Sequence, residues 1–373
     1  MSLKKRESLL RNGSFQTILA SLLCIALGLL VGYIVLLIIN PGGASKAIMA
    51  ILKNYMYYPS AAAAKKYLGT TLVNASALLM CSLSVLFAYK VGLFNIGAAG
   101  QYVVGAGACI YGALALKLPW YLCLIFAILA AALAGGISGA LKAYFNVNEV
   151  ISCIMLNWIS LYCVNMLLAK VKEQSTPYTI PLSTGNPGAL LPNMGLDKLF
   201  SKNEFVTIGL PLAVIMAVLV WVLLEKTKFG YELKATGLNK NAAKYCGMKE
   251  QRNVILTMMI AGGLAGCAAG IYYLTGIEQW MVQQTSVPAM GFNGIAAAFL
   301  GGLSPIGTIF SSYFIQHITS GGTYVDKSMY CTQISDLISA FIIYLCGFVL
   351  FFKMWLNRWL DKRDEKAKKG GDA

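Results

Sequence analysis

The sequence contains few charged residues, and this scarcity excludes most classes of soluble protein. Only 12% of the 373 residues are Asp, Glu, Lys or Arg, whereas 58% are hydrophobic. Soluble domains carry about 25% charged residues. Half of that charge, combined with long apolar runs, predicts a protein embedded in a lipid bilayer. We therefore expect an all-α fold, a polytopic transmembrane helical bundle.

The sequence also lacks the motifs of common catalytic and metal sites. Because no Gly is followed by Lys, the chain has no G-x-x-x-x-G-K-[ST] phosphate loop, and it has neither H-E-x-x-H nor G-x-S-x-G. The ten cysteines form no C-x-x-C pair, and the one histidine is His317. These absences predict that the chain is not an enzyme, has no metal site or cofactor of its own, and cannot hydrolyse ATP.

The net charge of +15 could indicate a nucleic-acid partner, but the position of the basic residues argues against one. The Lys and Arg residues lie between apolar segments and not along one face of a soluble domain. An excess of Lys and Arg in cytoplasmic loops is the ordinary explanation in a membrane protein. We predict no nucleic-acid partner.

Ten apolar segments predict about ten membrane spans, since roughly 20 helical residues cross the hydrocarbon layer. The eighth and ninth are short, are separated by Gly301-Gly302 and Pro305, and could instead be half-helices. The predicted spans are 15–39, 70–89, 92–116, 119–141, 150–169, 205–224, 253–274, 288–301, 303–318 and 333–352.

The distribution of Lys and Arg predicts the orientation of these spans. With the N-terminus inside, the inner segments contain 20 Lys and Arg residues and the outer segments contain 10. This bias predicts a multi-pass plasma-membrane protein with both termini in the cytoplasm. Residues 1–373 then form a single transmembrane domain with spans over about 15–352, an internal polar loop at 225–252 and a charged cytoplasmic tail at 353–373.

Glycine rows predict close contacts between the spans. Gly262, Gly266 and Gly270 recur at every fourth position of one span, and Gly135 and Gly139 do so on another. Small residues at this spacing let helix backbones approach closely in a membrane.

The spans contain almost no charge but several amides. Glu149 and Asp336 lie near span ends, so a mid-membrane acidic site of the kind used by ion-coupled pumps is missing. The amides could hydrogen-bond between helices or line a path for a neutral solute, and the sequence leaves both readings open. They are Asn74, Asn95, Gln101, Asn157, Asn165 and Asn293.

The internal loop 225–252 predicts two short helices, one ending at Gly237 and the other running from Asn239 to Gly247. We expect Gly237 to adopt a backbone conformation that a Cβ atom disfavours. By itself the pattern is that of a solvated hairpin. It also resembles the coupling segment of ABC importer permeases, which docks into a groove of the ATPase.

Three further segments strengthen this resemblance: 93–101 (LFNIGAAGQ), 148–157 (NEVISCIMLN) and 291–301 (GFNGIAAAFLG). They resemble signature segments of the permease family that transports ribose-type sugars, branched-chain amino acids and nucleosides. The second segment is most similar to the nucleoside and simple-sugar branch. Two positions depart from the family pattern, since Ala99 stands where Glu is common and Asn293 where Asp is common.

The resemblance implies a membrane-spanning permease subunit of an ATP-driven ABC importer in a bacterial plasma membrane. Its implied partners are an ABC ATPase subunit that binds the ATP, a second permease subunit, identical or homologous, an extracellular solute-binding lipoprotein, the solute and membrane lipid. The implied solute is a nucleoside or a simple sugar. The alternative is an ion-coupled secondary transporter of a small polar solute. The residues implied to contact the ATPase are Glu232, Lys234, Ala235, Gly237, Asn239, Ala242 and Ala243.

A similarity between two segments of the chain predicts where the solute passes. Residues 92–99 (GLFNIGAA) and 291–297 (GFNGIAA) lie on spans that cross the bilayer in opposite directions. An inverted repeat would produce this arrangement, with the second to fifth spans matching the seventh to tenth, and such repeats place solute sites near the midplane. The predicted pathway residues are Asn95, Gln101, Asn157, Phe292 and Asn293.

Overall fold

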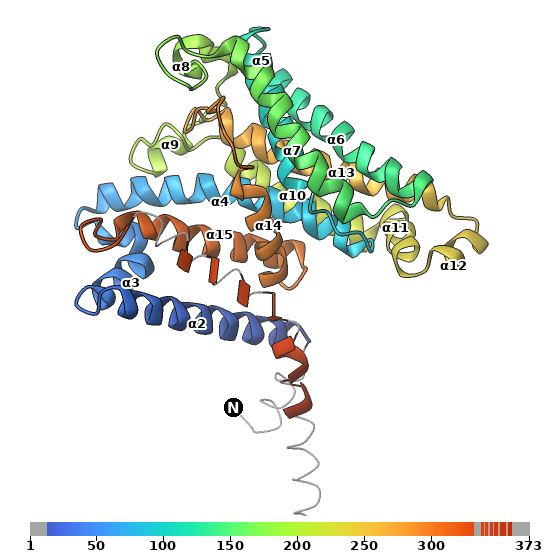
Figure 1. The fold of residues 1–373 in the computed structure, drawn as a ribbon, viewed down its shortest axis with the longest axis horizontal. Coiled ribbons are helices and arrows are strands. Elements are labelled where there is room, and N and C mark those ends of the chain that lie inside the picture. Colours follow the sequence, from blue (N-terminus) through green and yellow to red (C-terminus); the bar gives the residue numbers. More distant parts are fainter. Residues whose placement is uncertain are drawn as a thin grey trace, which may run out of the picture. The chain divides into compact units, whose positions relative to one another are not determined.

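The structure, a computed structural model, is mainly helical over the part of the chain that it describes, and the only β pairing there consists of two isolated bridges (Figure 1). The described residues are 13–331, 337–338, 340–341, 344–345, 347–349, 351–355 and 357–359. An all-α bundle is what the sequence predicts. Most of the charged tail, 353–373, lies outside the described residues.

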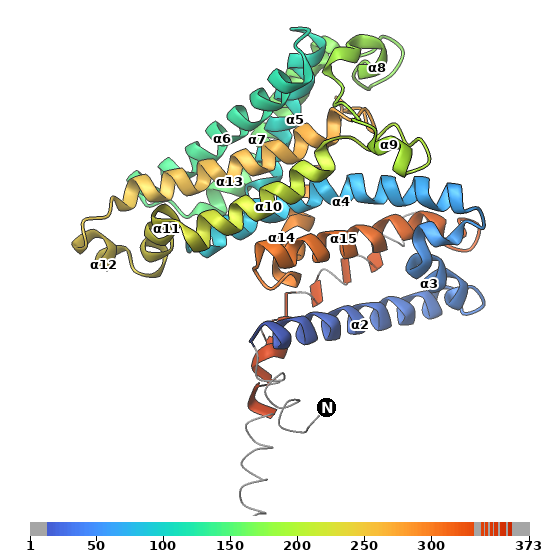
Figure 2. The ribbon, with the colours of Figure 1, turned by 180° about the vertical axis from the view of Figure 1, so that it is seen from behind.

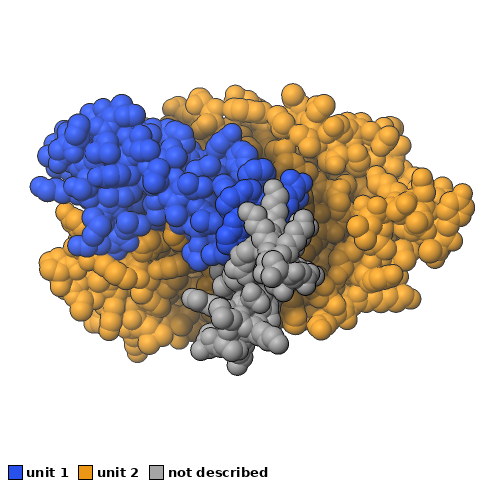
Figure 3. Space-filling view, turned by 90° about the horizontal axis from the view of Figure 1, so that it is seen from below, with its two compact units in different colours: residues 1–54, 299–302, 318–373 blue, residues 55–298, 303–317 orange. Residues whose placement is uncertain are grey.

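The chain divides into two compact units, which Figure 3 colours separately. Unit 1 comprises residues 1–54, 299–302 and 318–373, and unit 2 comprises residues 55–298 and 303–317. Each unit is described by itself below. The single domain over 1–373 stays a prediction.

Unit 2 is built around two long helices, α4 and α13, that are mostly buried by their neighbours (Figures 1 and 2). The most apolar windows of α4 and α13 are 89% and 78% buried, against 33%, 33% and 28% for α6, α7 and α10. The outer helices therefore expose apolar faces, as expected of helices that contact lipid. The six main helices are α4 (Ala61–Lys90), α5 (Ala98–Leu114), α6 (Trp120–Phe145), α7 (Glu149–Leu168), α10 (Gly209–Lys226) and α13 (Glu250–Tyr273).

The helices agree with most predicted spans but shift some boundaries. Helix α4 begins nine residues before the predicted position 70, because the run from Ala61 to Ala64 favours helix. The start predicted for the next span at 92 is wrong, because the chain turns at Gly92, where φ is +77°, and α5 begins only at Ala98. Of the described helices, six are long and apolar enough to cross a membrane, and α5 and α14 are shorter apolar helices.

The predicted break near residue 302 is present. Helix α14 (Ala289–Leu300) ends before a turn in which Gly302 and Leu303 have positive φ, and Pro305 then begins α15 (Pro305–Gly321). Nine of the 20 residues of the predicted tenth span, 333–352, fall outside the described residues. The count of ten spans and the inverted repeat stay predictions.

Unit 1 contains a helix that the sequence analysis missed. Helix α2 (Gly13–Ile39) matches the first predicted span. Helix α3 (Ala44–Lys53) lies between the first and second predicted spans, where the sequence predicts no helix. Helix α3 is too short to span a membrane and buries one face through Ala44, Ala47, Ala50 and Ile51. The Tyr330 hydroxyl closes this unit by donating to the Asn40 carbonyl at 2.7 Å, and η4 (Gly322–Tyr324) follows α15.

The two polar connections of unit 2 lie at opposite ends of its long helices (Figures 1 and 2). Residues 170–204 are largely irregular, with only short helical turns: η2 (Ala169–Val171), α8 (Leu182–Gly185), η3 (Pro187–Ala189) and α9 (Leu196–Leu199). The other end carries α11 (Lys228–Leu238) and α12 (Lys240–Tyr245).

Glycines bring α13 into backbone contact with α6 and α5, as the glycine rows predict. A Cβ atom on Gly262 would collide with the Ala131 carbonyl of α6, and one on Gly135 would collide with the Met258 carbonyl of α13. A Cβ on Gly105 of α5 would lie 2.6 Å from the Cα of Gly266. Lipid gives helices no hydrophobic reason to associate, so this close packing stabilises the bundle.

The bundle predicts opposite outcomes for two adjacent glycines of α13. Gly262→Ala should lower the melting temperature by several degrees, because the new methyl group has no space beside Ala131 and overpacking typically costs about 1–3 kcal/mol. Gly263→Ala is the matched control, because no neighbouring atom would lie nearer than 3.5 Å to its Cβ. Thermal unfolding of both variants in lipid nanodiscs measures this. Equal melting temperatures would contradict the packing.

Candidate functional site

Helices α11 and α12 form the predicted pair of short helices, and side chains cap both. Thr227 caps α11 by accepting a hydrogen bond from the Gly230 N–H at 3.0 Å. Asn239 caps α12 by accepting a hydrogen bond from the Ala242 N–H at 3.0 Å. These capping residues define where each helix begins. The first helix runs one residue beyond Gly237 and ends at Leu238.

The conformation predicted for Gly237 is wrong, and the reason for glycine there is different. Gly237 is helical; the positive φ of this segment belongs to Gly247, at +81°. A Cβ on Gly237 would collide with the Val91 carbonyl, and one on Gly92 would lie 2.8 Å from the Gly237 carbonyl oxygen. The end of α11 thus packs backbone against backbone on the turn between α4 and α5. Only glycine allows this approach.

One face of α11 is fixed to the bundle. A Cβ on Gly230 would collide with the Leu223 carbonyl of α10, and Leu233 is fully buried. Asn253 of α13 donates to the Thr236 hydroxyl at 2.8 Å in a buried position. Helices α10, α13 and the α4–α5 turn therefore all hold α11, so that a displacement of α11 must also displace these elements.

The residues predicted to contact an ATPase lie together on α11 and α12, with different exposures. Asn239 and Ala242 are exposed, whereas Ala243 is buried within the segment. Glu232, Lys234, Ala235 and Gly237 are half-buried, and Lys234 pairs with Glu225 at 3.1 Å.

The most exposed apolar residues of this segment were not selected from the sequence. Leu238 is 89% exposed and Tyr245 is 94% exposed, and each is the last residue of its helix. In the sequence, these two large apolar residues stand out within an otherwise polar loop. Such residues are typical of a surface that a partner protein covers.

Three predicted pathway amides lie buried at the start of α5. Asn95 and Gln101 exchange hydrogen bonds of 2.8 and 3.1 Å, and Asn95 also donates to the Ser84 hydroxyl of α4 at 3.2 Å. Asn157 of α7 accepts from the Gly100 N–H at 2.8 Å and donates to the Ile96 carbonyl at 3.2 Å. The amides therefore satisfy one another and the backbone where α5 begins inside the bundle.

Two of these amides also border a cavity. Gln101 and Asn157 line a space of about 310 Å³ between α5, α6 and α7, together with Ser138 and Ser160. The rest of its wall is mainly apolar and includes the exposed side chains of α6 and α7 that face away from the bundle.

Phe292 and Asn293 lie on α14, between two close contacts of that helix. A Cβ on Gly291 would collide with Ala99 at the start of α5, and one on Gly294 would lie 2.9 Å from Cys81 of α4. These contacts bring the helix that carries Asn293 to the elements that hold the Asn95 network. Asn293 is half-buried, and Phe292 is 39% exposed. A pathway shared by Asn95 and Asn293 stays a prediction.

Asn74 differs from the other amides because it has a buried acceptor without a partner among the described residues. It lies near the middle of α4, on a side chain that is half-buried. An unsatisfied buried polar atom costs about 1–3 kcal/mol. The sequence marks Asn74 as a membrane amide, but only the structure distinguishes it from the amides that are paired, such as Asn165, which binds Trp280 and Gln284.

These features define a polytopic permease with a two-helix segment at one end that is held against the bundle. The chain belongs to the family described as the permease component of the branched-chain amino acid transport system, whose model matches residues 67–347.

Relatives match over most of their own length. The chain is 31% identical to the guanosine ABC transporter permease protein NupP of Bacillus subtilis, covering 87% of this chain and 92% of NupP. It is 31% identical to the nucleoside ABC transporter permease protein NupB of Lactococcus lactis, covering 97% and 99%. It is 30% identical to the glucose ABC transporter permease protein TsgB13 of Haloferax volcanii, covering 81% and 82%.

Second permease proteins from the first two bacteria are also similar, NupQ at 28% and NupC at 26% identity. No solved structure matches the chain.

The family membership establishes the general role of the chain. It is the membrane-spanning permease component of an ABC importer and a multi-pass protein of the plasma membrane. It is not an enzyme, because ATP hydrolysis resides in a separate subunit of such transporters. An ATPase and a solute-binding protein are its expected partners, in agreement with the resemblance found in the sequence.

The unpaired Asn74 oxygen predicts that stability and transport respond in opposite directions. Asn74→Leu should raise the melting temperature by a few degrees, because it removes a buried unsatisfied acceptor. The same variant should lower uptake, since an amide kept at a cost to stability is typical of a functional position. Thermal unfolding and uptake measured on one preparation test both parts.

Asn165→Leu is the matched control for this experiment. It removes an amide whose oxygen and nitrogen both have partners, so it should lower the melting temperature. If Asn74→Leu destabilises the protein as Asn165→Leu does, or leaves uptake unchanged, Asn74 is not a functional position with an unpaired acceptor.

Proposed function

We propose that this permease imports nucleosides, driven by ATP hydrolysis on its partner subunit. The observation that carries this proposal is the similarity to NupB along almost the whole length of both chains, supported by the similarity to NupP. NupB is named as a nucleoside permease, and NupP as a permease for the nucleoside guanosine. A simple sugar is the second candidate, supported by the similarity to TsgB13.

The polar groups of the bundle suit such a solute. The candidate pathway residues Asn95, Gln101, Asn157 and Asn293 are neutral amides, and Asn74 supplies an acceptor that is not yet used. Amides both donate and accept hydrogen bonds without requiring a counter-charge, as the base and ribose of a nucleoside need. Phe292, exposed on α14, offers an aromatic surface to a base.

The α11–α12 pair is the proposed contact with the ATPase. Glu232, Lys234, Ala235, Gly237, Asn239, Ala242 and Ala243 form or support this surface, and Leu238 and Tyr245 extend it. When the ATPases close, α11 transmits the movement to α10, α13 and the α4–α5 turn that hold it. Rigid-body displacement of helices is a common means of switching a transport pathway between faces.

The proposed assembly contains a second permease and an extracellular solute-binding lipoprotein. The weaker similarity to NupQ and NupC supports a partner that is related but not identical. The positive charge of residues 225–252 supports placing this loop, and both termini, in the cytoplasm. In this orientation residues 170–204 face the binding protein.

An ion-coupled mechanism is the alternative that the experiment must exclude. Uptake of radiolabelled guanosine by proteoliposomes that contain the permease, ATPase and binding protein tests the proposal. We expect uptake that requires internal ATP, persists when ion gradients are collapsed, and is reduced by excess adenosine but not by excess glucose. Uptake driven by an ion gradient without the ATPase would contradict the mechanism, and competition by glucose alone would shift the solute to a sugar.

A further inference from the structure

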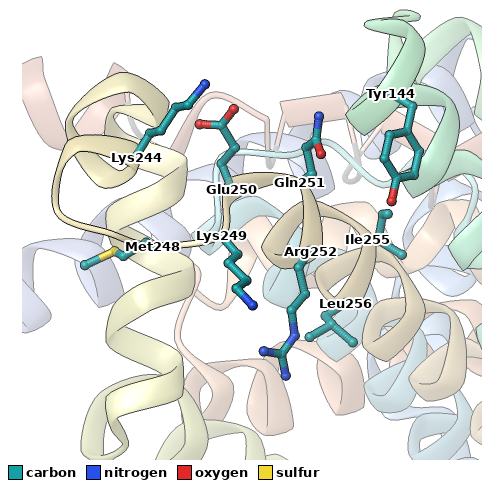
Figure 4. A pocket seen from close by; sticks show the side chains of 9 residues that line it. All are labelled: Tyr144, Lys244, Met248, Lys249, Glu250, Gln251, Arg252, Ile255 and Leu256. Atoms are coloured by element: carbon teal, nitrogen blue, oxygen red, sulfur yellow. The ribbon is translucent and has the colours of Figure 1, made fainter.

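A basic cavity of about 480 Å³ lies at the end of unit 2 that carries α11 and α12 (Figure 4). Its wall combines the connection between α12 and α13, the first turns of α13 and the last turn of α6. The lining residues are Tyr144, Lys244, Met248, Lys249, Glu250, Gln251, Arg252, Ile255 and Leu256. None of these residues belongs to the candidate pathway or to the residues proposed to contact the ATPase.

The cavity lies beyond a close contact between α6 and α13. At Gly139 of α6 a Cβ would lie 3.0 Å from the Cα of Ile255. Five residues further along α6, Tyr144 lines the cavity with its ring beside Ile255 of α13, and Ile255 and Leu256 add apolar side chains to the wall (Figure 4). The glycine contacts that hold the helices together therefore also fix the position of the cavity.

The charge of the cavity is unbalanced. Lys244, Lys249 and Arg252 line it against one carboxylate, Glu250. Among the described residues no salt bridge joins any of the four; the ion pairs present are Lys142–Glu149 and Lys234–Glu225. Lys249 and Arg252 extend their charged ends toward the same side of the cavity (Figure 4). Two such cations beside the first turn of a helix favour an anionic group.

The outer face of α6 leads to this cavity. Leu122, Phe126, Leu129, Leu133 and Ile137 form an exposed apolar stripe at helical spacing. Tyr144 continues the stripe two turns beyond Ile137 and is 63% exposed, and Phe145 beside it is 74% exposed. Exposed aromatic residues at the end of a spanning helix mark the membrane–water interface. These aromatic residues would place the cavity at headgroup level, at the end of an apolar face that acyl chains can cover.

We propose that this cavity binds the phosphate headgroup of an anionic phospholipid, with the acyl chains along the exposed stripe of α6. Arg252 and Lys249 donate to the phosphate oxygens, and Tyr144 covers the headgroup from α6. Glu250 disfavours a second negative charge, so a headgroup with a single charge such as phosphatidylglycerol fits best. The stripe favours a lipid over free phosphate, because a soluble anion would gain nothing from it.

Lipid retention by the full chain tests this proposal. The protein is taken from nanodiscs of phosphatidylcholine with or without phosphatidylglycerol, and bound lipids are counted by native mass spectrometry. Wild type should retain phosphatidylglycerol. The double variant Lys249→Gln/Arg252→Gln should retain at least about tenfold less, because each Lys or Arg near anionic lipid contributes measurably to its binding. Tyr144→Ser, on a different helix, should also lower retention.

The control is Lys226→Gln/Lys240→Gln, which removes the same charge from the same loop at positions that do not line the cavity. It should retain phosphatidylglycerol like wild type, and all variants should melt at the wild-type temperature in phosphatidylcholine. If the control variant loses as much phosphatidylglycerol, the lipid is held by general electrostatic attraction to the loop, and the proposed site is wrong.

Two further outcomes would overturn the proposal in favour of another occupant. If inorganic phosphate or glycerol phosphate displaces the lipid at equal concentration, the cavity recognises the soluble anion. If the ATPase subunit expels the lipid completely from the assembled transporter, the cavity is part of a protein interface.

Discussion

The bundle of unit 2 depends on close contact between helix backbones. Burying apolar side chains against each other gains little over leaving them in lipid, so helices associate where small residues let them approach. Gly262, Gly266 and Gly135 allow this between α13, α6 and α5, and Gly291 and Gly294 bring α14 to α5 and α4. Larger residues at these positions would separate the helices that hold the polar network at the start of α5.

The same kind of contact joins the α11–α12 pair to the bundle. Gly237 and Gly92 meet backbone to backbone, and Gly230 meets the Leu223 carbonyl. A side chain can rotate away from a displaced partner, but two backbones in contact must move together. In the proposed coupling, this contact is the route by which the short polar segment would pass movement from an ATPase to α4, α5 and α10.

The sequence predicts the helical class, most spans, the glycine rows and the two short helices, because each depends on local pattern. It misses α3, whose amphipathic run is too short to resemble a span, and it assigns the wrong reason to Gly237, whose partners lie about 145 positions away at Val91 and Gly92. Pattern alone also cannot separate Asn74 from Asn165, since whether an amide is satisfied depends on Trp280 and Gln284, far along the chain. The pathway and the ATPase surface stay proposals for the same reason.

The central claim, that the Gly237 contact couples ATP hydrolysis to transport, is tested most directly by Gly237→Val in the assembled transporter. Solute uptake and ATPase activity are measured on the same proteoliposomes, with Gly263→Ala as a control, because no neighbouring atom would lie nearer than 3.5 Å to its Cβ. The account predicts that Gly237→Val inserts normally and keeps its ATPase bound and active but loses uptake, whereas Gly263→Ala transports normally. Wild-type uptake by Gly237→Val would contradict it.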